Sequence, residues 1–136
     1  MPATMTLKDR SRSRGIKTGA RRVFVHRQTG TFDVKLFCDV YHIGREALAR
    51  MAGYSPRAVA DWASNKRVNT STLQRLTEVT RLCEALSNVV DPESIGEWMH
   101  TPNDAFDGST PLQVIERGEG DRLWRMIHHL ESGEPG

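Results

Sequence analysis

Residues 45–64 read REALARMAGYSPRAVADWAS, and this sequence predicts a helix, a tight turn and a second helix. Leu48 and Ala52 are four residues apart, so they share one face of the first helix and can pack together. Ala49 is small, as the close crossing of two helices requires. Gly53 fits the turn, because a residue without a Cβ adopts a positive φ at little cost.

The second helix is predicted to begin at Ser55, a residue type whose side chain caps helix N-termini. Pro56 then takes the first helical position, where its missing N–H costs nothing. Val59 and Trp62 follow at a spacing of three and face the first helix. Together these residues are typical of a helix-turn-helix, which places its second helix in the major groove of DNA. An ordinary helical hairpin is the alternative.

The whole chain has 136 residues, enough for one domain or two very small ones. No apolar run approaches the roughly 18 residues that cross a bilayer, and we expect no secretory signal, because no apolar segment follows the basic N-terminus. Cys38 and Cys83 both lie among apolar residues, which favours buried free thiols over a disulfide. These features predict a cytoplasmic protein without a membrane segment.

The net charge of +2 conceals an uneven distribution along the chain. Residues 1–27 contain eight basic residues against Asp9 alone, a net charge of +7. Residues 92–136 contain three basic and nine acidic residues, a net charge of −6. The basic segment suits phosphate or RNA binding, or is a solvated tail without a fixed partner. The acidic segment is repelled by DNA and suits a protein partner.

The predicted fold is all-α and has three parts. Residues 1–30 form a basic flexible arm, in which residues 1–20 are disordered and residues 21–25 form a short strand or simply run into the domain. Residues 31–90 form the helix-turn-helix domain, and residues 91–136 form a smaller helical domain, since the composition shifts at Asp91.

Apolar residues at helical spacing predict the helices outside the helix-turn-helix. The first is capped by Thr31 or Asp33, and the longest by Thr70 or Ser71. The longest helix packs within the monomer and could also serve as a dimer seam. The three main stripes are Val34, Phe37, Cys38 and Tyr41; Leu73, Leu76, Val79, Thr80, Cys83 and Leu86; and Leu123, Ile127 and Leu130.

The second half of the chain carries a pattern of spaced residues that resembles a known family. The pattern consists of Trp98, Pro102-Asn103, Phe106, Gly108, Pro111-Leu112, Val114-Ile115, Gly118, Leu123, Ile127, Leu130 and Gly133. It resembles the toxin-binding domain of the Xre/MbcA/ParS antitoxins, which join an Xre-like helix-turn-helix to this domain. Both halves are present in that order, and the resemblance covers roughly residues 32–133.

The resemblance implies an antitoxin of a type II toxin–antitoxin system. Family members usually bind and inhibit a RES-domain toxin, an enzyme that consumes NAD, and their complexes repress their own operon by binding operator DNA. It also implies a homodimer and a higher-order complex with the toxin. The chain departs from the family in its basic arm and in residues 131–136, which are short and acidic where members often continue with apolar residues.

The helix-turn-helix supplies the candidate DNA-binding residues. A second helix that enters the groove by its N-terminal half brings Arg57 to the bases, where a bidentate guanine contact is worth about 1–3 kcal/mol of discrimination. The alternative for Arg57 is an exposed helix arginine without a partner. Asp61 is a liability near DNA unless it pairs with Arg57 or accepts from a cytosine. The predicted set is Tyr54, Ser55, Arg57, Asp61, Ser64, Lys66 and Arg67, of which the last two suit phosphates.

The resemblance and the exposed side of the last helix supply the candidate toxin-binding residues. Trp98 and Trp124 are either interface anchors or core residues, whereas Trp62 belongs to the core of the helix-turn-helix. The predicted set is Trp98, Asn103, Arg122, Trp124, Arg125, His128 and Gly133.

We expect no enzymatic activity, no cofactor and no metal site. His128 and His129 are adjacent, so they point to different sides of a helix, and the sequence contains no Cys-x-x-Cys or glycine-rich phosphate loop. Two alternatives to the antitoxin remain: a stand-alone helix-turn-helix transcriptional regulator, and an interaction adaptor with a degenerate helix-turn-helix.

Overall fold

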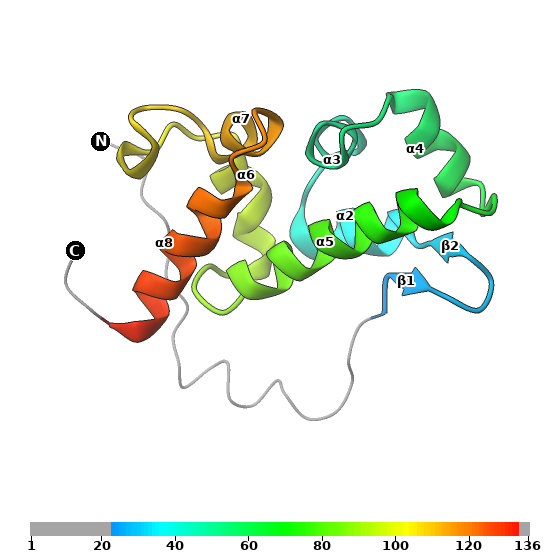
Figure 1. Cartoon of the computed structure of the whole chain (residues 1–136), viewed down its shortest axis with the longest axis horizontal. Coiled ribbons are helices and arrows are strands. Elements are labelled where there is room, and N and C mark those ends of the chain that lie inside the picture. The colour runs from blue at the N-terminus through cyan, green and yellow to red at the C-terminus, as the bar shows by residue number, and fades with distance from the viewer. Residues whose placement is uncertain (1–22, 134–136) are drawn as a thin grey trace.

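The computed structural model describes residues 23–133, so most of the predicted basic arm and the last three acidic-tail residues lie outside the described residues. The described part is mainly helical, as predicted, with one small hairpin (Figure 1). Its elements are β1 (Val25–His26), β2 (Thr31–Phe32), α2 (Val34–Tyr41), α3 (Arg45–Ala52), α4 (Pro56–Ala63), α5 (Thr70–Leu86), η1 (Pro92–Ser94), α6 (Ile95–Met99), η2 (Asp104–Phe106), α7 (Pro111–Glu116) and α8 (Gly120–Ser132).

The predicted flexible arm does not extend to residue 30, because residues 23–30 belong to a folded hairpin, and only Val25 of its first strand falls within the short strand considered for residues 21–25. β1 pairs antiparallel with β2, so that Val25 lies opposite Phe32. Phe24 is only 3% exposed, and its ring lies 5.6 Å from that of Phe37. Burial of Phe24 and Phe32 holds the hairpin against the helices. Strands of two residues are too short for an alternating pattern to reveal them in the sequence.

Helices α3 and α4 and the turn between them lie where the sequence predicts the two helices and the turn of a helix-turn-helix. Gly53 ends α3 with a φ of 79°, and the Ser55 side chain caps α4 by accepting a hydrogen bond from the Ala58 N–H at 3.1 Å. Leu48 and Val59 are fully buried between the two helices. Trp62 is 5% exposed and lies edge-on to Phe32, so the assignment of Trp62 to the core is confirmed.

The predicted N-cap of α2 is confirmed, whereas the predicted N-cap of α5 is wrong. Asp33 caps α2 by accepting from the Leu36 N–H at 3.0 Å, as predicted. The cap of α5 is Asn69, which accepts from the Thr72 N–H at 2.9 Å, so the predicted Thr70 and Ser71 lie one and two residues too late. The side-chain oxygen of Asn69 reaches the Thr72 N–H from just outside the helix, where a capping residue lies, whereas Thr70 and Ser71 are already inside it.

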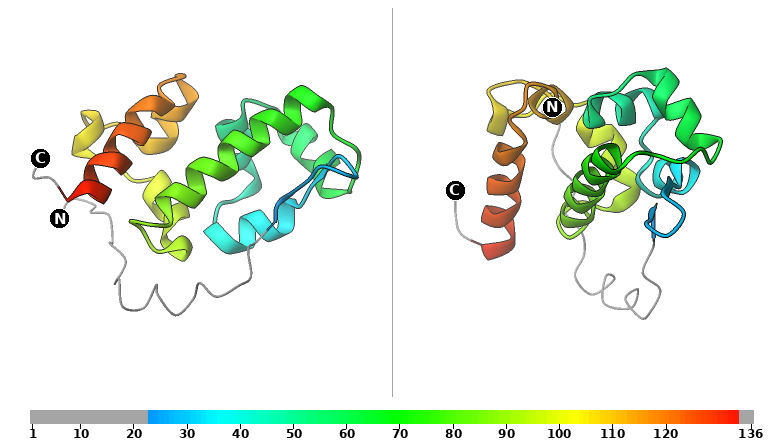
Figure 2. Two further views of the ribbon diagram at one scale, coloured as in Figure 1. Left: turned by 60° about the horizontal axis from the view of Figure 1, so that its bottom comes forward. Right: turned by 45° about the vertical axis from the view of Figure 1, so that its right-hand side comes forward.

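One continuous apolar core joins the two halves of the described chain. Its closest contact involves Gly96 in α6, where a Cβ would lie 1.7 Å from the carbonyl oxygen of His42 at the end of α2. The predicted boundary at residue 91 falls in the turn between α5 and η1, and buried side chains continue across it from Val90 to Ile95. Figure 2 shows α6 packed between α5 and α7 from two further directions.

Two further features are the state of the two cysteines and the apolar character of the helices. Cys38 is half-buried and Cys83 is buried, and both are free thiols. Burial raises the pKa of the Cys83 thiol, so it stays protonated. No helix within residues 23–133 combines the length and apolar character needed to cross a membrane.

Candidate functional site

The outer face of α4 is polar and exposed, and its charges are only partly paired. Asp61 pairs with Lys66 at 3.4 Å rather than with Arg57. Within residues 23–133 no side chain forms a hydrogen bond or ion pair with Arg57, which is exposed at the second position of α4. Its guanidinium is therefore available to a ligand, with all its donors unsatisfied by protein.

Three of the predicted DNA-binding residues have structural partners. Ser55 caps α4, and the Ser64 hydroxyl donates to the Ala60 carbonyl at 3.0 Å at the other end of that helix. The Tyr54 ring lies edge-on to Trp62, with 5.5 Å between centroids, and its hydroxyl accepts from Thr72 at 2.9 Å. Tyr54 thus fixes the turn against α5, although 37% of the residue remains exposed.

The predicted toxin-binding residues of α6 and the following loop serve the fold. Trp98 is 5% exposed, so it is a core residue and is not presented to a partner. Its indole N–H is the one buried side-chain polar group in the described residues without a hydrogen-bond partner. Asn103 caps η2 by accepting from the Ala105 N–H at 2.9 Å, which fixes the loop between α6 and α7.

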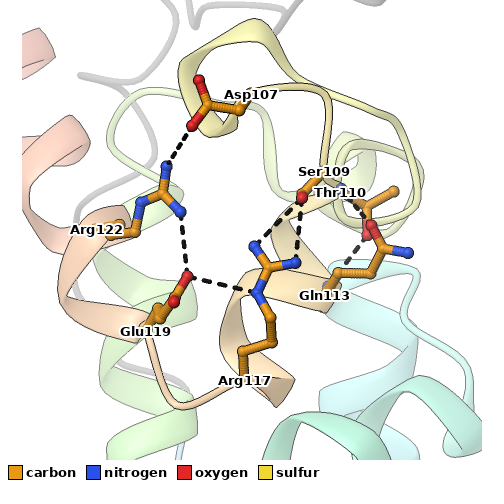
Figure 3. A network of polar contacts seen from close by, with 7 residues as sticks. All are labelled: Asp107, Ser109, Thr110, Gln113, Arg117, Glu119 and Arg122. Atoms are coloured by element: carbon orange, nitrogen blue, oxygen red, sulfur yellow. Dashed lines mark hydrogen bonds and ion pairs between the residues drawn. The ribbon is translucent and has the colours of Figure 1, made fainter.

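The arginines of α7 and α8 are held by a network of ion pairs and hydrogen bonds (Figure 3). Arg122 bonds Glu119 at 3.1 Å and pairs with Asp107 at 3.5 Å, and its guanidinium lies 5.6 Å from the centre of the Phe106 ring. Arg117 shares Glu119 at 3.4 Å and donates to the Ser109 hydroxyl at 3.2 Å. This network ties α8 to the loop that precedes α7.

The same loop ends in a capping box at the start of α7. The Thr110 hydroxyl accepts from the Gln113 N–H at 3.1 Å, and the Gln113 side chain accepts from the Thr110 N–H at 2.9 Å (Figure 3). The backbone N–H groups of Thr110 and Gln113 at the start of α7 are therefore both satisfied. The loop and α7 together form a rigid support for α8.

The outer face of α8 carries the predicted residues that remain available. Trp124 is 37% exposed, and it is the exposed tryptophan of the three in the chain. His128 is exposed four residues later, on the same helical face. Arg125 is exposed and pairs with Asp121 at 3.3 Å. Gly133 ends the helix with a φ of 73°.

Trp124 borders a shallow groove between the two halves of the chain. The groove has a volume of about 160 Å³, and its apolar lining comes from both halves: Met51, Val79, Leu82, Ile115 and Trp124. Beside it, Arg50 of α3 forms two hydrogen bonds with Glu116 of α7, at 2.8 and 2.7 Å. The Arg50 guanidinium lowers the pKa of the Glu116 carboxyl, mainly through these hydrogen bonds.

Comparison with known proteins places this arrangement in a family. Residues 85–123 match the family described as the antitoxin Xre/MbcA/ParS C-terminal toxin-binding domain. The mycobacterial cidal antitoxin MbcA of Mycobacterium tuberculosis is 28% identical over 89 residues, which cover 65% of this chain and 79% of that protein. These matches support the resemblance of the chain to the Xre/MbcA/ParS antitoxin family.

Two further comparisons agree with this resemblance. A probable mycobacterial cidal antitoxin of Mycobacterium tuberculosis is 27% identical over 70 residues, 52% of this chain and 60% of that protein. One chain in the crystal structure of the M. tuberculosis MbcT–MbcA toxin–antitoxin complex has the same fold, with a TM-score of 0.64 and 24% identity. That match covers 82% of this chain and 100% of the other chain.

Sequence reasoning missed three features of the chain that position its surfaces. The hairpin left no periodic signal, and the Arg50–Glu116 pair joins residues 66 positions apart in the sequence. Gly96 lies inside a helix, where a glycine with no turn to make is itself a sign of close packing. The family match ends at Leu123, so it does not include Trp124, Arg125 or His128 of α8.

Proposed function

We propose that this chain is the antitoxin of a type II toxin–antitoxin pair, and that it binds and inhibits a toxin protein. The observation that carries this proposal is the match of residues 85–123 to a toxin-binding domain. The relatives support it, since two of them are named as antitoxins and one solved chain comes from a toxin–antitoxin complex.

The proposed toxin-binding surface is the outer face of α8 with Trp124 at its centre. Exposed aromatic side chains beside an apolar groove are typical anchors of protein interfaces. Arg125, His128 and the helix end at Gly133 surround Trp124, whereas Arg122 and Asn103 act by holding the helix and its loop in place. Trp98 contributes through the core beneath.

The resemblance leads us to propose a RES-domain toxin that consumes NAD, and a homodimeric antitoxin in a higher-order complex with it. We further propose that α4 binds operator DNA, so that the complex represses its own operon. The free guanidinium of Arg57 and the exposed polar face of α4 support this second activity.

The test is to tag the chain in its host, purify it gently and identify a partner present in stoichiometric amount. We expect one small protein whose expression alone depletes cellular NAD and stops growth, and whose effect the wild-type chain reverses. Trp124→Ala should weaken the complex by about thirtyfold or more, the usual effect of losing an interface anchor. Arg81→Ala, an exposed arginine in the middle of α5, is the control.

A second variant separates the two proposed activities. Arg57→Ala should reduce operator binding and leave neutralisation intact, because α4 and α8 lie on different parts of the molecule (Figure 1). A homodimer that carries DNA and no protein partner would instead support the stand-alone regulator. Loss of neutralisation in a folded Arg57→Ala protein would contradict the division of labour.

A further inference from the structure

The hairpin tip and the loop between α4 and α5 form one continuous surface at the end of the molecule opposite α8 (Figures 1 and 2). The Val68 N–H donates to the Gly30 carbonyl at 2.7 Å, which ties the loop to the hairpin. Gly30 has a φ of 71°, and a Cβ there would lie 3.1 Å from the Cγ of Arg67. The absence of a side chain at Gly30 thus lets Arg67 lie across the hairpin turn.

This surface is cationic and has no acidic residues of its own. Residues 23–32 and 64–69 contain no Asp or Glu, and they carry Arg27, Lys66 and Arg67. In the part of the chain that the structure describes, neither Arg27 nor Arg67 forms an ion pair or a side-chain hydrogen bond, and both are exposed. Their charges are therefore not neutralised internally, in contrast to Lys66, which pairs with Asp61.

The neighbours of these arginines are also typical of contacts with a phosphate backbone. Gln28, Thr29 and Asn65 are exposed around them and carry amide or hydroxyl donors. Such donors, together with arginines, make most of the contacts that proteins form with DNA phosphates. The sequence directly before Val23 adds seven basic residues against Asp9.

We infer that the β1–β2 hairpin and the loop between α4 and α5 form a second DNA-contacting element, which binds the phosphate backbone through Arg27 of the hairpin and Arg67 of the loop beside the groove that α4 enters. The inference rests on the proposed binding of DNA by α4. A recognition helix reads bases with its N-terminal residues, so its C-terminal end lies toward the edge of the groove. The hairpin packs at that end of α4, where the phosphates of the flanking strand run.

The test is a salt titration of DNA binding by the full-length chain. Two 30-base-pair duplexes serve as probes, one from the region upstream of the gene and one with the same composition in shuffled order. Arg27→Ala and Arg67→Ala should each weaken binding several-fold for both duplexes. Each should also reduce the slope of log K against log salt by about 0.9, the value for one lost phosphate contact.

Matched variants guard against an indirect effect. Arg81→Ala removes the same charge from the middle of α5 and should leave both affinity and slope unchanged. Arg27→Lys and Arg67→Lys should restore most of the slope, because a phosphate accepts either cation. Circular dichroism and a thermal melt establish that each variant is folded.

Other results overturn the inference in distinguishable ways. If the alanine variants leave the slope unchanged while Arg57→Ala abolishes binding to the upstream duplex, the hairpin does not contact DNA although α4 does. If the wild-type chain binds neither duplex at 50 mM salt, the proposed DNA binding fails and the inference fails with it. If the variants impair toxin binding instead, the cationic surface serves the protein partner.

Discussion

The arginines of α4 and of the loop that follows it are held differently from those of the second half of the molecule. Arg57 and Arg67 are exposed and lack acidic partners among residues 23–133. In the second half, Arg117, Arg122 and Arg125 each pair with a nearby carboxylate. The same residue type therefore leaves its charge unpaired beside α4 and stabilises local structure in the second half.

The difference changes how the second half can bind a partner. Its positive charges are offset by Asp107, Glu119 and Asp121, so they offer little net attraction to an acidic ligand. The feature that remains unpartnered is the aromatic side chain of Trp124 next to an apolar groove. We therefore expect shape and apolar contact to dominate toxin binding, and charge to dominate DNA binding.

The largest effect is expected where the two halves touch, at Gly96. Gly96→Ala places a Cβ against the backbone carbonyl of His42, so α6 must move away from α2. We expect a loss of about 3 kcal/mol or more in the free energy of unfolding, measured by urea denaturation. Gly120→Ala is the control, because no atom lies within 4 Å of its added Cβ. A loss below about 1 kcal/mol would mean that the halves pack less tightly than described.

The next effect tests the paired and unpaired arginines directly. Arg122→Ala removes the bonds to Glu119 and Asp107 and the contact with Phe106, so it should lower the free energy of unfolding by about 1–2 kcal/mol. Arg57→Ala should change it by less than about 0.5 kcal/mol, as is usual for an exposed residue without partners. Thermal melts of both variants provide the measurement, and equal effects would remove the contrast between the halves.

A smaller effect is expected from the Arg50–Glu116 pair that links the halves. A double-mutant cycle with Arg50→Ala and Glu116→Ala should give a coupling of about 0.5–1 kcal/mol, because both side chains are more than one-third exposed. The folded pKa of Glu116 lies below its ordinary value of 4.5. This stabilisation is therefore fully present above about pH 5 and is lost as the pH falls through the folded pKa. A coupling that is the same at pH 3 and pH 7 would exclude the ion pair as its source.

The smallest effect is expected at Asp61, on the side of the molecule that is proposed to bind DNA. Asp61→Asn removes a negative charge from α4 and releases Lys66 from its ion pair, so affinity for duplex DNA should rise about two- to fivefold. Fluorescence anisotropy at low salt measures the change. Because Asp61 and Lys66 form an exposed pair, the substitution should change the melting temperature by less than about 2 °C from that of the wild type. Weaker binding in this variant would indicate that Asp61 itself accepts a hydrogen bond from a base.

Much of the helix-turn-helix could be predicted from the sequence because its signals are local. Gly53, Ser55 and Pro56 determine the turn and the start of α4 through their own backbone and side-chain chemistry. The cap of α5 was misplaced by one or two residues, since Asn69, Thr70 and Ser71 are all good capping residues and only the backbone course selects among them.

The features that the sequence did not reveal depend on contacts between distant residues. Phe24 reads as part of a basic tail until Phe37 and Tyr41 bury it. Arg122 reads as an exposed helix residue until the loop brings Asp107 to it. The positions of Trp98 and Trp124 could not be separated by residue type, because burial depends on how α6 and α8 pack and not on the tryptophans themselves. The contacts of the candidate surfaces with toxin and DNA stay predictions.

The shared core also affects how fast proteases degrade the chain. Because buried side chains from Phe24 to Ile127 form one cluster, we expect the fold to open cooperatively. A protease that cuts only the opened chain therefore removes both surfaces in one event, at a rate set by the population of the open form. A ligand on either surface lowers that population and protects the surface it does not touch. A ligand bound to one surface therefore also lengthens the half-life of the other surface, because both are lost in the same opening event.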